Sequence, residues 1–340
     1  MMKLPTKKRP TIADVAHLAG VSTATVSRAL QSPDLVSEKN RKLIFDVVSQ
    51  TGYRPNTAAK MLRQNRANTL LVVLPDIANP FFSEILSGIE DVATVHNYTI
   101  LISNTNGDDA RTRDLLGSLR NGRADGALLL NGQLPLPDHE IETLSLVSIS
   151  EAIPNAQILH VGTDSIAATR EATEYLITLG HKKIVHFGGP TGNILTKERE
   201  QGYRSAMQAA GLSDDITVIP SGFKLEDGQA SVDALLTKHD PPDAIVCASD
   251  IAAMGAISGL TKRGYQVPQD ISVIGFDDID FSSIFSPPLT TIRQNRKELG
   301  KRATLMLLGL IEGTLENPNM NVVEHSLIER SSTILRGVIA

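Results

Sequence analysis

The sequence predicts a small all-helical head followed by a larger α/β body made of two subdomains. Three observations support this fold class. The first 66 residues contain short amphipathic segments bounded by glycines and hydroxyl side chains, which are helix-boundary signals. From Thr69 onward, apolar runs alternate with amphipathic segments, as in parallel sheets with crossover helices. The 340 residues, 41% of them hydrophobic, suffice for two or three domains with their own cores.

Charge is divided unevenly between these two parts. The net charge of the chain is −5, but residues 1–66 contain 12 Lys and Arg against 4 Asp and Glu. The head therefore carries +8, and the remaining 274 residues carry −13. A basic end on an acidic body is typical of a nucleic-acid contact confined to that end, although a merely solvated basic terminus has the same composition.

Composition and motifs argue against several other classes. The one cysteine, Cys247, lies in the apolar run AIVCASD, so no disulfide within the chain is possible and we interpret it as a small buried residue. Neither a signal-peptide core nor 18 consecutive apolar residues occur, so we expect a cytoplasmic protein without a membrane span. His181 and His186 flank a strand without nearby ligand partners, which favours a structural role over zinc. We expect no catalytic residue, cofactor or metal, because no P-loop, GxSxG, GxGxxG or CxxC pair is present.

In the head, TIADVAHLAG predicts the first helix. Thr11 and Asp14 have capping-box spacing, and Gly20 ends the helix and permits a tight turn. Ser22 can cap a second helix, and Ser37 opens a third. Two helices joined by a short glycine turn and followed by a third helix form the helix-turn-helix arrangement.

The predicted second helix, residues 22–30, carries four hydroxyl side chains, although such residues favour non-helical conformations. Val26, Ala29 and Leu30 nevertheless have the spacing of an apolar helical stripe. A helix with small hydrogen-bonding side chains can approach base edges closely in a major groove about 12 Å wide. We therefore interpret it as a DNA recognition helix; the alternative is a polar surface helix in a three-helix bundle.

Three stretches of the head, TIADVAHLAGVSTATVSRAL, VSEKNRKLI and TGYRPNTAAKMLR, resemble the DNA-binding head of the lactose/galactose repressor (LacI/GalR) family of bacterial transcription factors. The residues that match the family's base-reading positions are Thr23, Ala24 and Arg28. Arg28 suits a bidentate contact with guanine. The side chains expected to hold phosphates or the core of the head are Thr25, Ser27 and Tyr53.

The segment PNTAAKMLR, residues 55–63, matches the hinge helix of that family, which folds against its twin in the minor groove. Asn56 can cap a helix here, and a helix this short orders only when docked. The resemblance implies that Leu62 wedges between base pairs and kinks the duplex, while Ala58 allows close approach. The alternative is a plain linker.

In the body, the runs TLLVVLPD, YTILIS, GALLLNG, HKKIVHFGG, DAIVCASD and ISVIGFDD predict parallel strands. The helices expected between them cover 82–96, 108–121, 197–210 and 251–263. Functional side chains in such folds gather at the carboxyl ends of strands. The candidates there or nearby are Asp76, Phe81, Phe82, Arg199, Phe223, Asp250 and Asp277. Charged groups can bind hydroxyls or polar ring edges and phenylalanine rings can pack on a flat ligand, but each residue also fits a capping or core role; Asp250 in particular could cap the helix after it.

Five stretches of the body, PDIANPFFSEILSGIE, GHKKIVHFGGP, REQGYRSAM, ASDIAAMGAISGL and VPQDISVIGFDDIDFSSIFSPPLTTI, are similar to the effector domain of the same family, which has the type I periplasmic-binding-protein fold. The residues matching the family's effector contacts are Phe81, Phe82, Arg199, Phe223, Asp250 and Asp277. The domains implied are a DNA-binding head over 1–54, a hinge and linker over 55–68, and an effector-binding and dimerisation body over 69–340. The N-subdomain would comprise about 69–165 and 294–325, and the C-subdomain about 166–293 and 326–340.

The stretches STATVSRAL, PFFSEI and LLLNGQLP most resemble the cytidine-responsive repressors of the family, which implies a nucleoside effector. One departure is that Ser150 and Glu151 follow LVSI, where many sugar-binding members have Asp or Asn. Another is that residues 191–198 lack the arginine and threonine pattern of the purine-responsive member.

The resemblance therefore implies a repressor that binds a near-palindromic operator as a dimer and responds to a nucleoside or sugar in the interdomain cleft. No leucine heptad follows residue 326, so a dimer is the simplest assembly. The alternatives are a solute-binding protein or a sugar- or nucleoside-processing α/β enzyme with an unrelated basic head. The first would need a signal peptide, and the second lacks a nucleophile, metal cluster or phosphate loop in the sequence.

Overall fold

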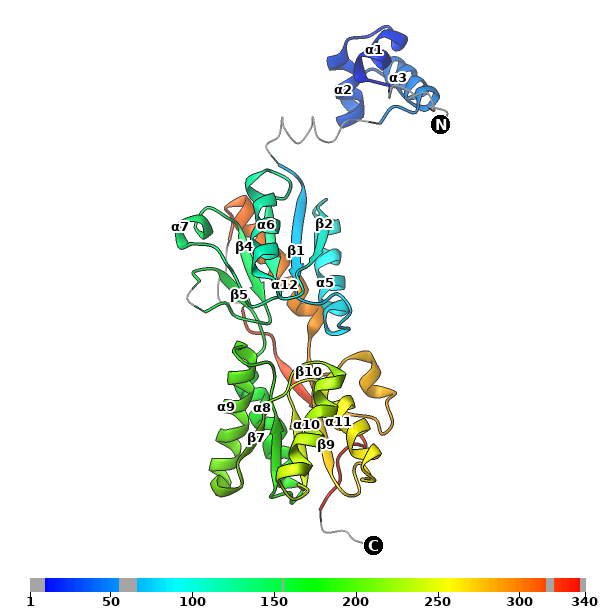
Figure 1. Cartoon of the computed structure of the whole chain (residues 1–340). Helices are drawn as coiled ribbons and strands as arrows, with labels where there is room; N and C mark the ends of the chain where they lie inside the picture. Colours follow the sequence, from blue (N-terminus) through cyan, green and yellow to red (C-terminus); the bar gives the residue numbers. More distant parts are fainter. Residues whose placement is uncertain (1–9, 55–65, 155, 316–320, 337–340) are drawn as a thin grey trace, which may run out of the picture. The chain divides into compact units, whose positions relative to one another are not determined.

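The computed structural model describes residues 10–54, 66–154, 156–315 and 321–336. They belong to two compact units, Met1–Arg66 and Ala67–Ala340 (Figure 1). The predicted hinge residues Asn56, Ala58 and Leu62 lie outside the described residues.

The head contains three helices, α1 (Ile12–Ala19), α2 (Thr23–Gln31) and α3 (Glu38–Thr51), with a 3₁₀ turn, η1 (Pro33–Leu35), before α3. The predicted capping box is present: the Thr11 N–H donates to the Asp14 carboxylate at 2.8 Å, and the Asp14 N–H donates to the Thr11 hydroxyl at 3.3 Å. Gly20 ends α1 in the left-handed region, with φ at 63°. Ser22 caps α2 by accepting from the Thr25 N–H at 3.1 Å. Local capping therefore sets the turn between α1 and α2.

One apolar core holds the three helices together. Its buried members are Val15, Ala16, Ala19, Val26, Ala29, Ile44, Val47 and Tyr53. Val26 and Ala29, two members of the stripe predicted on α2, are fully buried, and Leu30 is half-buried. Burying this narrow stripe leaves Thr23, Ala24 and Arg28 exposed on the outer side of α2.

The first sheet of the body has five parallel strands in the order β2-β1-β3-β4-β5. Their bounds are β1 (Thr69–Leu74), β2 (Thr99–Asn104), β3 (Gly126–Leu129), β4 (Leu146–Ile149) and β5 (Leu159–Val161). The helices that accompany it are α5 (Phe81–Val95), α6 (Asp109–Arg120), α7 (Asp138–Ile141) and α12 (Arg296–Glu312). We call this layer the N-subdomain.

The second sheet has six strands in the order β11-β10-β9-β8-β6-β7, all parallel except β11. Their bounds are β6 (Ile184–Phe187), β7 (Thr217–Ile219), β8 (Ala244–Cys247), β9 (Ser272–Asp277), β10 (Thr290–Gln294) and β11 (His325–Ile328). The helices that accompany it are α8 (Ser165–Thr178), α9 (Ile194–Ala209), α10 (Leu225–Lys238) and α11 (Asp250–Lys262), with two 3₁₀ turns, η2 (Ser213–Asp215) and η3 (Asp280–Ser283). We call this layer the C-subdomain.

The chain passes between the subdomains from β5 to α8, from β10 to α12, and from α12 to β11. Helix α12 thus returns to the first sheet, and Figure 1 shows it, in orange, among the cyan and green elements of the N-subdomain. Two glycines bring α12 against α5 backbone to backbone. A Cβ at Gly88 would lie 2.1 Å from the Lys297 carbonyl oxygen, and one at Gly300 would lie 2.2 Å from that of Ile85.

The four predicted body helices correspond to α5, α6, α9 and α11; only the start of α9 differs by more than one residue, because α9 begins at Ile194. No helix within the described ranges is long and apolar enough to cross a membrane. Cys247 is buried, and burial raises the pKa of its thiol.

Candidate functional site

A cavity of about 210 Å³ is lined by both subdomains, where the carboxyl ends of strands from the two sheets meet. The N-subdomain contributes Pro75, Asp76, Asn79, Phe81, Phe82, Leu130, Ser150 and Glu151. The C-subdomain contributes Pro190, Leu195, Arg199, Phe223, Lys224, Asp227, Ser249 and Asp277. Of the seven residues predicted for the effector, all but Asp250 line this cavity.

One wall is formed by the start of α5. Phe81 and Phe82 are the first two residues of the helix, and their rings meet edge to face with centroids 5.2 Å apart. The loop before them is fixed by its own side chains: Asn79 accepts from the Phe81 N–H at 2.9 Å, and Asp76 accepts from the backbone N–H two residues later at 3.0 Å. Phe223 of the other subdomain adds a third ring. The cavity thus offers several aromatic rings to a ligand.

Two cations line the cavity, Arg199 and Lys224, and Arg199 is almost fully buried. One terminal nitrogen donates to the Ala248 carbonyl, and the guanidinium carbon lies 3.8 Å from the centroid of Phe276 and 5.8 Å from that of Phe223. Burial lowers the pKa of this guanidinium, which nevertheless stays protonated because its ordinary value is so high. Its Nε is buried and has no hydrogen-bond partner among the described residues.

Asp277 ends β9 in an unusual backbone conformation, with φ at 123°. A non-glycine residue with such a φ is strained, and strain of this kind is concentrated at functional sites. Its carboxylate accepts from the Gln294 amide at 2.7 Å. Burial raises the pKa of Asp277, and the positive charge of Arg199 opposes that rise. Asp277 is therefore a hydrogen-bond acceptor of the cavity whose carboxylate is fixed in place by Gln294.

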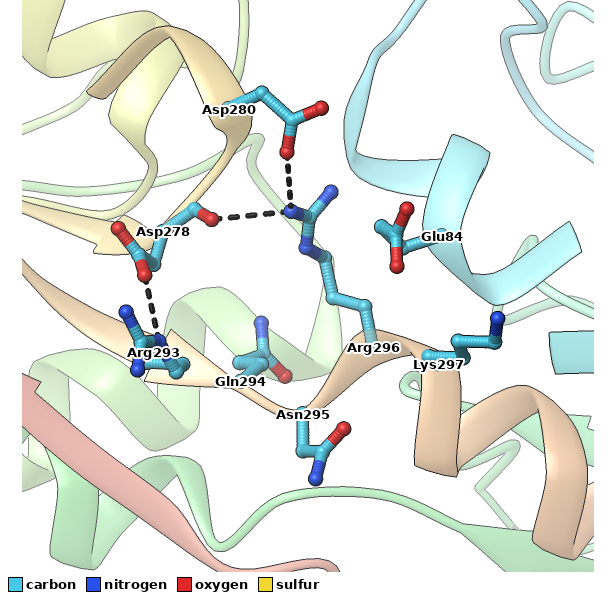
Figure 2. A pocket seen from close by; sticks show the side chains of 8 residues that line it. All are labelled: Glu84, Asp278, Asp280, Arg293, Gln294, Asn295, Arg296 and Lys297. Carbon is cyan, nitrogen blue, oxygen red and sulfur yellow. Dashed lines mark hydrogen bonds and ion pairs between the residues drawn. The ribbon is translucent and has the colours of Figure 1, made fainter. Parts of the chain in front are cut away.

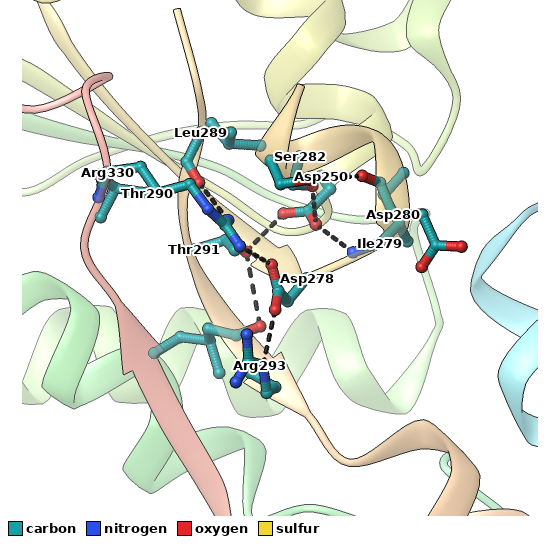
Figure 3. A network of polar contacts seen from close by, with 12 residues as sticks. Asp250, Asp278, Ile279, Asp280, Ser282, Leu289, Thr290, Thr291, Arg293 and Arg330 are labelled. Atoms are coloured by element: carbon teal, nitrogen blue, oxygen red, sulfur yellow. Dashed lines mark hydrogen bonds and ion pairs between the residues drawn. The ribbon is translucent and has the colours of Figure 1, made fainter. Parts of the chain in front are cut away.

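Asp250, which the resemblance assigns to the effector, does not line the cavity. Figure 3 shows its carboxylate in a network of polar contacts with Ile279, Ser282 and Thr291. Its fully buried carboxylate accepts hydrogen bonds from the Ile279 N–H at 2.9 Å, the Ser282 hydroxyl at 2.6 Å and the Thr291 hydroxyl at 2.5 Å. Ser249, rather than Asp250, caps α11. Burial, with the nearby charge of Asp277, raises the pKa of Asp250. Asp250 thus holds the loop that follows Asp277.

Glu151 is a cavity residue that the sequence noted only as a departure from sugar binders. It follows β4 in the N-subdomain and accepts from the side-chain amide of Asn193, the N-cap of α9 in the C-subdomain, at 3.0 Å. Burial raises the pKa of Glu151. Lys224 and Asp227 also line the cavity unpredicted, and the Lys224 N–H donates to the Asp227 carboxylate at 3.0 Å. The available signal was that Lys224 directly follows the predicted site residue Phe223 in the sequence.

In the head, Thr23, Ala24 and Arg28 are exposed on α2, as base-reading side chains must be. Ser27 is half-buried. The Thr25 hydroxyl lies 2.9 Å from the Ser22 hydroxyl and belongs to the N-cap of α2. Tyr53 is buried in the core of the head.

Most of the net positive charge of residues 1–66 is contributed by residues outside the range 10–54. Residues 10–54 contain five Lys and Arg and four Asp and Glu, a net +1. The remainder of the +8 is contributed by residues 1–9, with four cations, and residues 55–66, with three. Seven of the twelve Lys and Arg of residues 1–66 therefore belong to these two flanking segments.

Comparison with known proteins agrees with both units. Residues 11–56 match the bacterial regulatory proteins of the lacI family, and residues 173–333 match the periplasmic binding protein-like domain. The chain is 38% identical over 328 residues to the HTH-type transcriptional repressor CytR of Escherichia coli (strain K12), which covers 95% of this chain and 96% of that protein. It is 32% identical over 334 residues to the HTH-type transcriptional repressor PurR of Haemophilus influenzae (strain PittEE), with 94% and 98% covered.

A solved structure of the Lac repressor dimer bound to operator and the anti-inducer ONPF matches with a TM-score of 0.86 at 26% identity, covering 96% of this chain and 100% of that chain. The predicted family and fold class are thus confirmed. The chain belongs to the lacI family of bacterial regulatory proteins and is a transcriptional regulator with a helix-turn-helix head and a periplasmic-binding-protein-like body.

Proposed function

We propose that this regulator is a cytoplasmic repressor that binds a near-palindromic operator as a homodimer, and that a nucleoside in the cavity controls its binding. The observation that carries the proposal is that both subdomains line the cavity. A ligand in the cavity contacts both subdomains, so its affinity depends on their position relative to each other. It shifts operator binding only through its different affinities for two such arrangements.

The chemistry of the lining favours a nucleoside over a simple sugar. Phe81, Phe82 and Phe223 offer aromatic faces to a planar base. Arg199 can donate to a base carbonyl, and the Glu151 carboxylate can accept from ribose hydroxyls or an exocyclic amine, since both residues line the cavity. The similarity to the repressor CytR supports the same choice.

Two apolar surfaces of the body support a homodimer. Leu101 and Ile102 on the edge strand β2 are 46% and 37% exposed, and Phe281 and Ile284 in and after η3 are 53% and 78% exposed. Exposed apolar groups on an edge strand and beside a sheet end are typical of surfaces that a second copy covers. The similar Lac repressor structure is a dimer.

The test uses the full-length protein in a genome-wide selection of DNA fragments at low ionic strength, with and without cytidine, uridine or adenosine. We expect a near-palindromic sequence to be enriched, and the degree of enrichment to change when a nucleoside is added. We also expect the nucleoside to raise the unfolding temperature of the protein. If no sequence is enriched over random competitor DNA, the proposal that the protein binds a specific operator is rejected. An equal shift with ribose alone rejects the base contact, and conversion of the nucleoside indicates the enzyme alternative.

A further inference from the structure

A second, strongly polar cavity of about 330 Å³ lies where β10 leads into α12 (Figure 2). Its lining includes the cations Arg293 and Arg296 and the carboxylates of Asp278 and Asp280. Most of these charges are already paired with one another, so the cavity offers little to a charged ligand. Its distinguishing feature is one lining side chain, Arg296, that contacts both subdomains.

Arg296 links the two subdomains. It is the first residue of α12 and only 6% exposed. Its guanidinium donates to the Pro80 carbonyl of the N-subdomain at 3.3 Å and to the Asp278 carbonyl of the C-subdomain at 3.0 Å. The Asp280 carboxylate lies 3.5 Å away on the same side as Asp278. Figure 2 shows Arg296 extended toward Asp278 and Asp280.

Both carbonyls adjoin residues of the effector cavity. Pro80 directly precedes Phe81, and Asp278 directly follows Asp277, which line that cavity from its two sides. Separating the subdomains would break at least one of these hydrogen bonds. It would leave a buried guanidinium short of partners, which is costly. Arg296 therefore favours the present spacing of Phe81 and Asp277.

We infer that Arg296 is a positioning residue that couples the effector cavity to the spacing of the two subdomains. The inference rests on the proposed function, because the spacing matters only if a ligand senses it. Arg296 does not line the effector cavity and acts through the Pro80 and Asp278 backbone. Since its anchors are backbone carbonyls, only substitution of Arg296 itself removes the link.

Arg293 is the matched control. It lines the same polar cavity and carries the same charge, but its guanidinium pairs with the Asp278 carboxylate at 2.7 Å, inside the C-subdomain. Arg293→Gln therefore removes one charge from this cavity and leaves the link between subdomains in place.

The experiment measures the distance between the subdomains in the full chain by double electron–electron resonance. Spin labels at Asp114→Cys on α6 and Gln208→Cys on α9 report it, because both positions are exposed while the native Cys247 is buried. An excess of unlabelled protein suppresses distances between copies. We expect Arg296→Gln to lengthen the mean distance and broaden its distribution, and Arg293→Gln to leave both unchanged. Cytidine affinity should change with Arg296→Gln by about tenfold, an ordinary allosteric coupling.

Should Arg296→Gln fail to fold, Arg296→Lys replaces it. An ammonium group reaches one carbonyl at a time, so a smaller shift in the same direction is expected. An unchanged distribution in the folded Arg296 variant overturns the inference, and so does an equal shift in Arg293→Gln. The distance needs neither operator nor nucleoside, so its failure is distinct from failure of the proposed function.

Discussion

The guanidinium of Arg199 lies over the ring of Phe276, with its central carbon 3.8 Å from the ring centroid. The ring and the Ala248 carbonyl together fix the orientation of this buried cation before any ligand arrives. Preorganisation of this kind lowers the entropy that binding costs, so we expect a ligand response to depend on Arg199.

Arg199→Ala and Asp277→Ala should each leave operator affinity without ligand nearly unchanged and abolish its response to cytidine. Both residues line the effector cavity and lie in the body, apart from the head. Fluorescence anisotropy on a labelled operator measures both quantities. Arg204→Ala is the control, since Arg204 forms an i,i+4 ion pair with Glu200 on the same helix and does not line the cavity. A retained response removes the substituted residue from the site.

Arg28→Ala should weaken operator binding by about 1–3 kcal/mol, roughly 5- to 150-fold, and weaken binding to random DNA far less. The exposed guanidinium on α2 is suited to read a guanine, which random DNA offers only by chance. Competition titrations with operator and random duplexes give the ratio. Lys39→Ala, an exposed cation on α3, should lower both affinities alike. Equal losses for Arg28→Ala would rule out base readout.

Neutralising the amino-terminal cations should act on all DNA sequences equally. Replacing Lys3, Lys7, Lys8 and Arg9 by Gln removes half of the net charge of the head. If these cations contact phosphates, the slope of log affinity against log salt should fall in magnitude by about 3 to 4. Titrations over a salt series measure it, with Lys182→Gln/Lys183→Gln in the body as the control. An unchanged slope would show that the flanking charge does not contact DNA.

His186 should make the body sensitive to acid. Its ring is fully buried, and Nδ1 lies 2.9 Å from the Val246 carbonyl, which only a protonated Nδ1 can satisfy. Burial lowers the pKa of His186 from 6.5 to about 4. The unfolded chain therefore binds more protons between these two values, so stability is lost as pH falls from 6.5 toward 4.

The loss attributable to His186 is about 3 kcal/mol. Urea unfolding at several pH values in that window measures it. His186→Asn keeps a donor for Val246 and should flatten the pH dependence, while His239→Asn, at an exposed position, should preserve it. Identical pH profiles for His186→Asn and the unaltered chain would contradict this assignment.

Gly88→Ala should destabilise the body by about 1–3 kcal/mol or more, because its Cβ would meet the rigid Lys297 backbone carbonyl of α12. Gly117→Ala on α6 is the control. No atom lies within 4 Å of a Cβ there, so the substitution should stabilise the helix by about 0.5–1 kcal/mol. Chemical denaturation gives both values. A neutral Gly88→Ala would mean that α5 and α12 separate easily.

The head was predictable because its boundaries are local. Thr11, Asp14 and Ser22 interact with residues three positions away, so their spacing in the sequence already specifies the caps. The three-residue strands β5 and β7 were not predicted, because their apolar stretches are short and each strand is defined by pairing with one neighbouring strand. Helix α8 was missed because its buried face consists largely of alanine, serine and threonine, which weakens the hydrophobic period.

The rule that parallel strand ends carry functional side chains selected Asp76 and Asp277, and both line the cavity. The same rule selected Asp250, which does not line the cavity. The groups that donate to its carboxylate lie 29 to 41 residues away in the sequence and in other elements, so the sequence does not reveal them. Glu151 was not assigned for a similar reason. Its partner Asn193 comes from the other subdomain, and only the folded chain brings the two together.

The contact of Gly88 with α12 also bears on biosynthesis. Helix α5 emerges from the ribosome about 200 residues before the helix that covers it. Until then Ile85 and Ile89, which end up fully buried, have no α12 to pack against. The N-subdomain of the nascent chain therefore lacks α12 during most of translation. During that time its exposed apolar surface is available for chaperones to bind.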